Sequence, residues 1–321
     1  MKNKPIILVA GEPKSIFFEI FFKSLKKNNF KSPLVLICCK YLLIKEMKKN
    51  KFNKSLNIIE TNKLKNLTLN NKSINLINIK IEKSSNKSKQ NKLSKRYIGE
   101  TFKVAFQLIK KKFTNKFING PINKKTFLNK SFFGVTEYIS NNFNEKKIGM
   151  LIYNEKLSVC PLTTHLPIKL VSKEISKKLI IDKITVINSF FKKILKTKPR
   201  IAVTGLNPHC ETILKFNEDE KIVSAAIKTQ KTKGINVKGP YSADTIFLKK
   251  NRVKFNIILG MYHDQVLGPF KTLFEYDAIN VTMGLPFLRV TPDHGPNEKM
   301  LGKNKSTAQS LIKALKFLDN K

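Results

Sequence analysis

Short apolar runs alternate along the chain with longer segments whose apolar residues recur at helical spacing. The short runs predict buried strands, which we expect at residues 5–10, 34–38, 116–118, 148–153, 157–160, 201–204, 255–259 and 278–283. The helical spacing predicts helices at residues 15–28, 96–112, 173–196, 218–230 and 306–318, and one that ends near residue 49. Because strands and helices alternate, the pattern favours an α/β fold around a largely parallel sheet.

One segment, residues 83–95, departs from this pattern. It consists mostly of Lys, Ser, Asn and Gln and has almost nothing to bury, so we expect a flexible surface loop there. The apolar runs elsewhere are too short for a transmembrane helix, which needs about 20 predominantly apolar residues. The run at residues 5–10 is also too short for a signal peptide, and it leads into Gly11-Glu12-Pro13 as a strand leads into its loop. We therefore expect no membrane partner.

Polar clusters follow several of the predicted strands. The chain has four histidines, His165, His209, His263 and His294, and each lies in a short polar cluster with Pro or Gly after a strand-like run. Strand ends in a parallel sheet converge at one edge, where His165, His209 and His263 could hold a borderline divalent metal ion and leave a position open for substrate. Such an ion would stabilise the alkoxide that forms when an alcohol is oxidised. The alternative is that these histidines are structural.

The chain is strongly basic. It has 62 Lys and Arg residues against 22 Asp and Glu residues, which gives a formal net charge of +40. Such a field attracts polyanions, but only four of the basic residues are Arg, the side chain that recognises bases and phosphates through its planar guanidinium group. We therefore predict no specific nucleic-acid partner and expect the charge to draw phosphorylated small molecules in a salt-sensitive way.

The four cysteines, Cys38, Cys39, Cys160 and Cys210, form no CxxC pair. The simplest interpretation is a reduced cytoplasmic protein without a disulfide framework. Cys210 directly follows His209, so a thiolate metal ligand is the alternative at that position.

Several motifs along the chain occur in a distinctive order. They are Gly120-Pro121-Ile122-Asn123-Lys124, Thr163-Thr164-His165-Leu166-Pro167, Gly205-Leu206-Asn207-Pro208-His209, Gly239-Pro240 with Ala243-Asp244-Thr245, Met261-Tyr262-His263-Asp264-Gln265, Asn280-Val281-Thr282-Met283-Gly284-Leu285-Pro286-Phe287-Leu288-Arg289 and Pro292-Asp293-His294-Gly295. In this order the set resembles the 4-hydroxythreonine-4-phosphate dehydrogenase family of vitamin B6 synthesis, and the resemblance spans nearly the whole chain.

The resemblance implies a two-domain α/β/α fold like that of the isocitrate and isopropylmalate dehydrogenases, with the active site in the interdomain cleft. The first domain would comprise residues 1–128 and 299–321. The second, residues 129–298, would hold the metal site and the interface of a homodimer whose active sites lie between subunits. The family binds NAD or NADP without the glycine-rich dinucleotide motif, which agrees with the absence of that motif here.

The resemblance also assigns site residues. It implies a divalent metal (Zn, Mg, Mn or Co) on His165, His209 and His263, and a cofactor contact at His294 and Gly295. The implied substrate-binding residues are Thr136, Lys271, Asn280 and Arg289. Lys271 is also a catalytic candidate, together with Asp244 and Asp264, which we expect to orient the histidines or accept a proton. The alternative for the two aspartates is a turn-capping role.

The implied reaction is hydride transfer from the C3 hydroxyl of 4-phosphooxy-L-threonine to NAD(P). The product is a β-keto acid that loses CO₂ to give 3-amino-2-oxopropyl phosphate, on the route to pyridoxal phosphate. This chain departs from the family at Val135, where the family has a substrate-contacting His. It also lacks family glycines at residues 11–19 and after His209, and has Pro296-Asn297 where small residues are usual. Glycines let the backbone approach a ligand closely.

Three hypotheses follow from these observations. The first is an active 4-hydroxythreonine-4-phosphate dehydrogenase. The second is a relative that oxidises another phosphorylated hydroxy acid, such as a threonate or erythronate phosphate. The third is a family derivative that binds a ligand or partner without catalysis.

Overall fold

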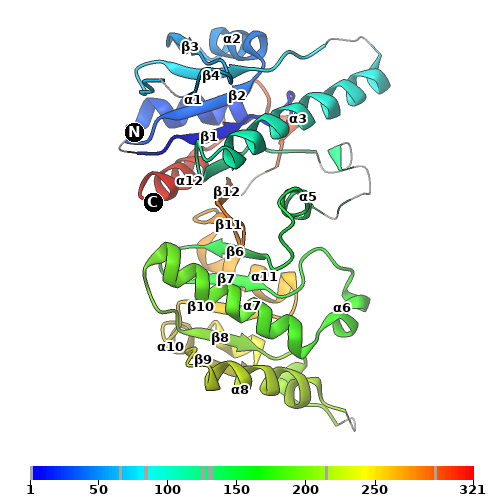
Figure 1. Cartoon of the computed structure of the whole chain (residues 1–321). Helices are drawn as coiled ribbons and strands as arrows, with labels where there is room; N and C mark the ends of the chain where they lie inside the picture. The colour runs from blue at the N-terminus through cyan, green and yellow to red at the C-terminus, as the bar shows by residue number, and fades with distance from the viewer. Residues whose placement is uncertain are drawn as a thin grey trace. The chain divides into compact units, whose positions relative to one another are not determined.

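The computed structural model describes residues 3–64, 67–82, 86–123, 127–128, 132, 134–213, 216–292 and 295–321. The chain folds into two compact units, which Figure 1 shows in the colours of the chain order. Unit 1 comprises residues 1–138 and 286–321, and unit 2 comprises Ile139–Leu285. Strands and helices alternate in both units, so the α/β class predicted from the sequence is confirmed.

Unit 1 contains a parallel sheet. Its strands are β1 (Ile6–Val9), β2 (Leu34–Cys38), β3 (Leu56–Ile58), β4 (Ile74–Asn78), β5 (Lys116–Asn119) and β12 (Leu288–Pro292). They lie in the order β3-β4-β2-β1-β5-β12, and every pair is parallel. All residues of β1 and β2 are buried, as expected for strands whose two faces are both covered.

The helices of unit 1 are α1 (Phe17–Lys27), α2 (Lys40–Lys49), α3 (Lys87–Lys110), η5 (Glu298–Met300) and α12 (Gln309–Asp319). Helix α5 (Val135–Asn142) begins in unit 1 and continues past its last residue, Tyr138. Helix α3 packs on β1 and β2, whereas α12 packs on β12, on β1 and against α1. The last residues of α12 also hold a turn, because the Asp319 carboxylate accepts hydrogen bonds from the backbone N–H groups of Lys31 (3.0 Å) and Ser32 (2.6 Å).

Helix α3 corrects the loop predicted at residues 83–95. Residues 83–85 lie outside the described part of the chain, but from Lys87 onward the segment is helical. The Asn86 side chain accepts hydrogen bonds from the N–H groups of Ser88 (2.9 Å) and Lys89 (3.1 Å), which starts the helix. The prediction was wrong because it considered only the lack of apolar residues. Lys and Gln have high intrinsic helix propensity, so this segment can form an exposed helix with few apolar residues.

Unit 2 contains a mixed sheet. Its strands are β6 (Gly149–Tyr153), β7 (Ser158–Pro161), β8 (Ile201–Thr204), β9 (Val237–Tyr241), β10 (Ile257–Gly260) and β11 (Ile279–Met283). They lie in the order β11-β6-β7-β10-β8-β9. Strand β6 is antiparallel to both of its neighbours, whereas β7, β10, β8 and β9 are parallel. The buried core beside them includes Val159, Ala202, Ile258, Val266 and Phe270.

The helices of unit 2 are α6 (Ile168–Glu174), α7 (Lys177–Phe190), η2 (Phe191–Leu195), η3 (Pro208–Cys210), η4 (Asp219–Ser224), α8 (Ala225–Thr232), α9 (Ala243–Ile246), α10 (Lys249–Arg252) and α11 (His263–Phe274). Helices α7 and α8 pack side by side (Figure 1). The single helix predicted at residues 173–196 is interrupted, because Ser176 begins a new helix by accepting a hydrogen bond from the Leu179 N–H at 3.3 Å. Among the described residues, no helix combines the length and apolar character needed to cross a membrane.

The domain boundaries that the resemblance implied, 1–128 with 299–321 and 129–298, stay a prediction. The compact units group residues 129–138 and 286–298 with the terminal segments. Residues 286–298 belong with unit 1 because they contain β12, which pairs in parallel with β5. Leu288 lies opposite Lys116, and Val290 lies opposite Ile118.

Asp319→Asn should lower the free energy of unfolding by about 1–2 kcal/mol. A hydrogen bond to a charged acceptor contributes about 1.5–3 kcal/mol, and the Asn side chain keeps only one of the two acceptor oxygens, without the charge. Urea unfolding followed by circular dichroism measures this. Asp182→Asn is the matched control, since Asp182 pairs with Lys147 at 2.8 Å on the surface and exposed pairs contribute about 0–1 kcal/mol. Equal losses in the two variants would contradict the role given to Asp319.

Candidate functional site

Three neighbouring strands of unit 2 end at the same edge of its sheet. Strand β10 pairs in parallel with β7 on one side and β8 on the other. The chain after β7 leads to His165, the chain after β8 to His209, and the chain after β10 to His263. The parallel register therefore brings the starts of the three histidine-bearing segments together, as the sequence predicted.

Hydrogen bonds join these segments just beyond the strands. The Leu162 N–H donates to the Gly260 carbonyl at 2.7 Å, and the Thr163 hydroxyl donates to the Met261 carbonyl at 2.8 Å. The β7 segment is thus fixed to the β10 segment two residues before His165 and two residues before His263.

His263 is the first residue of α11, and its ring contacts a carboxylate. Its Nδ1 lies 2.6 Å from Asp264 Oδ1. A carboxylate at this distance accepts a hydrogen bond from Nδ1–H, which makes Nε2 the ring nitrogen that can bind a metal. The His165 ring lies close by, with its centroid 6.3 Å from that of His263 and the two ring planes at 33°.

His209 lies in the 3₁₀ turn η3 after β8. Both His209 (φ 57°) and Cys210 (φ 64°) have left-handed backbone conformations, which are uncommon for residues other than Gly, although Asn, Asp and His adopt them more often than most. The turn is held by the buried Asp219 carboxylate, which accepts hydrogen bonds from the N–H groups of Leu206 (2.6 Å) and Asn207 (2.9 Å). Burial, aided by the Asp219 charge, raises the pKa of the Cys210 thiol, so the neutral thiol dominates at pH 7.

His165, His209 and His263 are the predicted ligands of a metal ion. Among the described residues, no three His, Cys, Asp or Glu side chains form a group that could hold a metal ion. The three-histidine site therefore stays a prediction. The donor type is suitable, because neutral imidazole is a common ligand of such ions, and the ring centroids of His165 and His263 lie 6.3 Å apart.

The other predicted residues of unit 2 lie on different elements. Lys271 lies on α11 with its Nζ 5.7 Å from the centre of the Tyr276 ring, and burial lowers the pKa of its ammonium group. Asn280 lies on β11, and its Oδ1 is buried without a hydrogen-bond partner among the described residues. A buried acceptor of this kind suits a ligand that donates a hydrogen bond. Asp244 is exposed on α9.

Unit 1 brings two predicted substrate residues together. Arg289 of β12 is only 3% exposed, and its guanidinium group donates to Asn119 Oδ1 (3.0 Å) and to the Thr136 hydroxyl (2.8 Å). Burial lowers the pKa of Arg289 to about 10 against the opposing effect of the Glu137 carboxylate, so the group stays charged at pH 7. Val135 precedes Thr136 as the first residue of α5.

Asn119 contacts Arg289 in unit 1, and Gln265 contacts the histidine-bearing segments in unit 2, but neither was assigned a role from the sequence. Asn119 ends β5, immediately before the Gly120-Pro121 motif, and its place at a strand end was the only signal. Gln265 lies within the motif that carries His263, so its position was visible but its hydrogen-bond partners were not.

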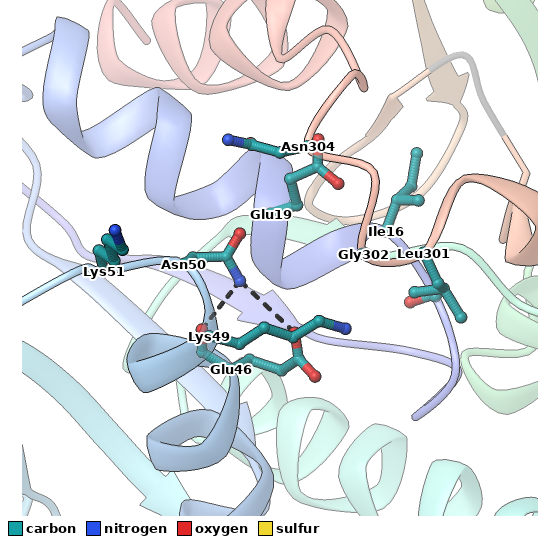
Figure 2. A pocket seen from close by; sticks show the side chains of 10 residues that line it. Ile16, Glu19, Glu46, Lys49, Asn50, Lys51, Leu301, Gly302 and Asn304 are labelled. Carbon is teal, nitrogen blue, oxygen red and sulfur yellow. Dashed lines mark hydrogen bonds between the residues drawn. The ribbon is translucent and has the colours of Figure 1, made fainter.

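A polar hollow of ≈ 280 Å³ lies in unit 1. Its lining includes Ser15, Ile16, Glu19, Glu46, Lys49, Asn50, Lys51, Leu301, Gly302 and Asn304. Figure 2 shows Glu19 of α1, Glu46 of α2 and Asn50 around it, with Leu301 and Gly302 from the chain that follows Gly295. The Ile16 N–H donates to the Pro296 carbonyl at 3.1 Å, which fixes this chain to the start of α1. The cofactor candidate His294 lies outside the described residues.

Thr136→Val should lower the free energy of unfolding by about 1–3 kcal/mol, because it removes a hydroxyl that accepts a hydrogen bond from the buried Arg289 guanidinium. Chemical denaturation measures the change. Thr229→Val is the control: the Thr229 hydroxyl donates to the Ala225 carbonyl within helix α8, so its loss should change stability by less than about 0.5 kcal/mol. A Thr136→Val loss no larger than the control's would rule out the contribution of this contact.

Comparisons with known proteins show the family to which the chain belongs. A model of the family described as pyridoxal phosphate biosynthetic protein PdxA matches residues 30–318. The 4-hydroxythreonine-4-phosphate dehydrogenase of Sulfurihydrogenibium sp. (strain YO3AOP1) is 34% identical over 318 residues, which cover 97% of this chain and 96% of the relative. The D-threonate 4-phosphate dehydrogenase of Salmonella typhimurium (strain LT2) is 27% identical over 327 residues, which cover 99% of this chain and 98% of the relative.

Among solved structures, the 4-hydroxythreonine-4-phosphate dehydrogenase of Klebsiella pneumoniae matches with a TM-score of 0.81 and 27% identity, covering 98% of each chain. This structural similarity confirms the fold expected from the sequence. The family match and the 34% identical relative confirm the family resemblance. The chain belongs to the pyridoxal phosphate biosynthetic protein PdxA family.

Proposed function

We propose that this protein is an oxidoreductase that converts 4-phosphooxy-L-threonine to 3-amino-2-oxopropyl phosphate in pyridoxal phosphate biosynthesis. The observation that carries the proposal is the 34% identity over 97% of the chain with a 4-hydroxythreonine-4-phosphate dehydrogenase. The proximity of His165 and His263, which belong to two of the family motifs, also supports it, since their ring centroids lie 6.3 Å apart in unit 2.

The proposed reaction removes a proton from the C3 hydroxyl and a hydride from C3. NAD or NADP accepts the hydride, and the resulting β-keto acid loses CO₂. A divalent ion (Zn, Mg, Mn or Co), held by His165, His209 and His263, would polarise the hydroxyl and stabilise the negative charge that develops on its oxygen. Asp264 contributes by holding Nδ1 of His263, so that Nε2 stays available as the ligand atom.

Lys271 is the proposed proton acceptor. Burial lowers the pKa of its ammonium group, which favours the neutral amine, and only the neutral amine can accept the hydroxyl proton. Asn280 would accept a hydrogen bond from the substrate with its buried Oδ1. Asp244 is proposed to orient a histidine, in keeping with the usual carboxylate partner of ligating imidazoles.

Arg289 and Thr136 are the proposed anchors of the substrate's anionic groups. The Arg289 guanidinium is charged, buried and fixed by Asn119, which suits recognition of a phosphate or carboxylate. The net charge of +40 adds a field that draws phosphorylated substrates to the protein.

For the cofactor we propose a position beside Gly295, with His294 as a contact. The polar hollow of Figure 2 is bordered by the chain that follows Gly295, and it offers hydrogen-bonding groups near that segment. We further propose a cytoplasmic homodimer without a specific nucleic-acid or membrane partner.

The second candidate is a dehydrogenase of another phosphorylated hydroxy acid, such as D-threonate 4-phosphate. Val135 stands where the resemblance implies a substrate-contacting His, so one contact expected for 4-phosphooxy-L-threonine is absent here. A relative with the threonate phosphate activity in its name is 27% identical over 99% of the chain.

Purified protein should form NADH or NADPH from 4-phosphooxy-L-threonine, and EDTA should abolish the rate until Zn, Mg, Mn or Co is restored. The absorbance of the reduced nicotinamide measures the rate of NADH or NADPH formation. D-threonate and D-erythronate 4-phosphates are assayed in parallel. His263→Ala should remove both activity and stoichiometric metal. Turnover of a threonate or erythronate phosphate alone would establish the second candidate, and no turnover by folded, metal-loaded protein would exclude both dehydrogenase activities.

Val135→His should lower the KM for 4-phosphooxy-L-threonine about tenfold, because it adds a donor for an anionic group, and one hydrogen bond to a charge contributes about 1.5–3 kcal/mol. Steady-state kinetics measures the change, and kcat should stay within about twofold. Val253→His is the control, because Val253 is an exposed residue after α10. An unchanged KM would show that Val135 does not face the substrate.

A further inference from the structure

Gln265, the third residue of α11, joins two of the histidine-bearing segments. Among the described residues, its side chain takes part in three hydrogen bonds. Its Oε1 accepts from the Met261 N–H (2.7 Å) and from the Thr204 hydroxyl (2.7 Å), and its Nε2 donates to the Gly205 carbonyl (2.8 Å). Met261 belongs to the segment after β10, whereas Thr204 is the last residue of β8 and Gly205 follows it.

The same network extends to the third segment. The Met261 carbonyl accepts from the Thr163 hydroxyl (2.8 Å), so the residue whose N–H is held by Gln265 also holds the segment after β7. From these fixed points the chain runs two residues from Met261 to His263, two from Thr163 to His165 and four from Gly205 to His209. One side chain therefore helps to set the separation of all three segments.

Glutamine is the side chain that these partners require. A carboxamide offers an oxygen that accepts two hydrogen bonds and a nitrogen that donates. Glutamate would keep the acceptor but place a second oxygen against the Gly205 carbonyl, and methionine would match the length but lose all three bonds. The close fit extends to Gly260, where an added Cβ would lie 2.3 Å from a Val266 methyl carbon and 3.1 Å from Gln265 Oε1.

We infer that Gln265 is a positioning residue for the metal site, acting through the backbone of the segments that carry His165, His209 and His263. This inference rests on the proposed function, because it requires those histidines to bind a metal. Groups that orient metal ligands typically change metal affinity 10–100-fold when replaced.

The test compares Gln265→Met with Gln230→Met. Gln230 is a fully buried glutamine of the same unit whose Nε2 donates to the Ile181 carbonyl (2.8 Å) and the Thr185 hydroxyl (3.0 Å), between α7 and α8. Both variants lose buried amide hydrogen bonds, but only Gln265 contacts the strand ends. Circular dichroism checks that each variant is folded.

Titration of the apoprotein with Co²⁺, followed by its visible absorption, should show affinity at least tenfold weaker in Gln265→Met and within twofold of wild type in Gln230→Met. With saturating Co²⁺, kcat should fall at least tenfold in Gln265→Met. Gln265→Glu, which keeps the Oε1 acceptor, should lose less affinity than Gln265→Met. Equal Co²⁺ affinities for Gln265→Met and Gln230→Met would overturn the inference.

Amide hydrogen exchange separates this inference from the proposed function, because it needs no metal, cofactor or substrate. The Met261 amide should exchange faster in Gln265→Met, since its N–H loses its acceptor. Faster exchange with unchanged Co²⁺ affinity would show that the link exists but does not position the metal ligands, leaving the proposed function intact. A wild-type protein that binds no Co²⁺ would overturn both the metal site and the positioning role.

Discussion

The parallel pairing of β10 with β7 and β8 is the constraint on which unit 2 depends. Ile257 lies opposite Ser158 on one side and opposite Ile201 on the other, and the following residues keep this register to the strand ends. A register shift of one residue would turn each side chain to the opposite face of the sheet. It would also displace the Met261 carbonyl from Thr163 and the Met261 N–H from Gln265, so the loop links exist only in this register.

Much of this architecture could be predicted from the sequence because it is local. The run at residues 255–259 predicted β10, and the polar residues after it predicted the edge near which the rings of His165 and His263 lie. Strand β12 was missed because Arg289 interrupts its apolar run, although that arginine is buried. Strand β9 was missed because it contains Gly239 and Pro240, which usually end strands.

The contacts of Gln265 and Asn119 could not be predicted for a different reason. Gln265 bonds to Gly205, 60 residues earlier, and Asn119 bonds to Arg289, 170 residues later. A spacing pattern carries no information on pairs so far apart, and the Gly205 partner is a backbone carbonyl that every residue type possesses. Such links become visible only when the sheet order is known.

The return of the chain from unit 2 to β12 has a consequence for folding during synthesis. Strand β12 and helix α12 complete unit 1, yet they follow the whole of unit 2 in the sequence. When the ribosome has made residue 285, every strand of unit 2 has been synthesised, whereas β5 still lacks the neighbour that covers its second edge. An exposed strand edge is a template for wrong pairing. The nascent chain therefore passes through an interval in which all strands of unit 2 have been synthesised but the second edge of β5 has no partner, until residues 288–292 follow.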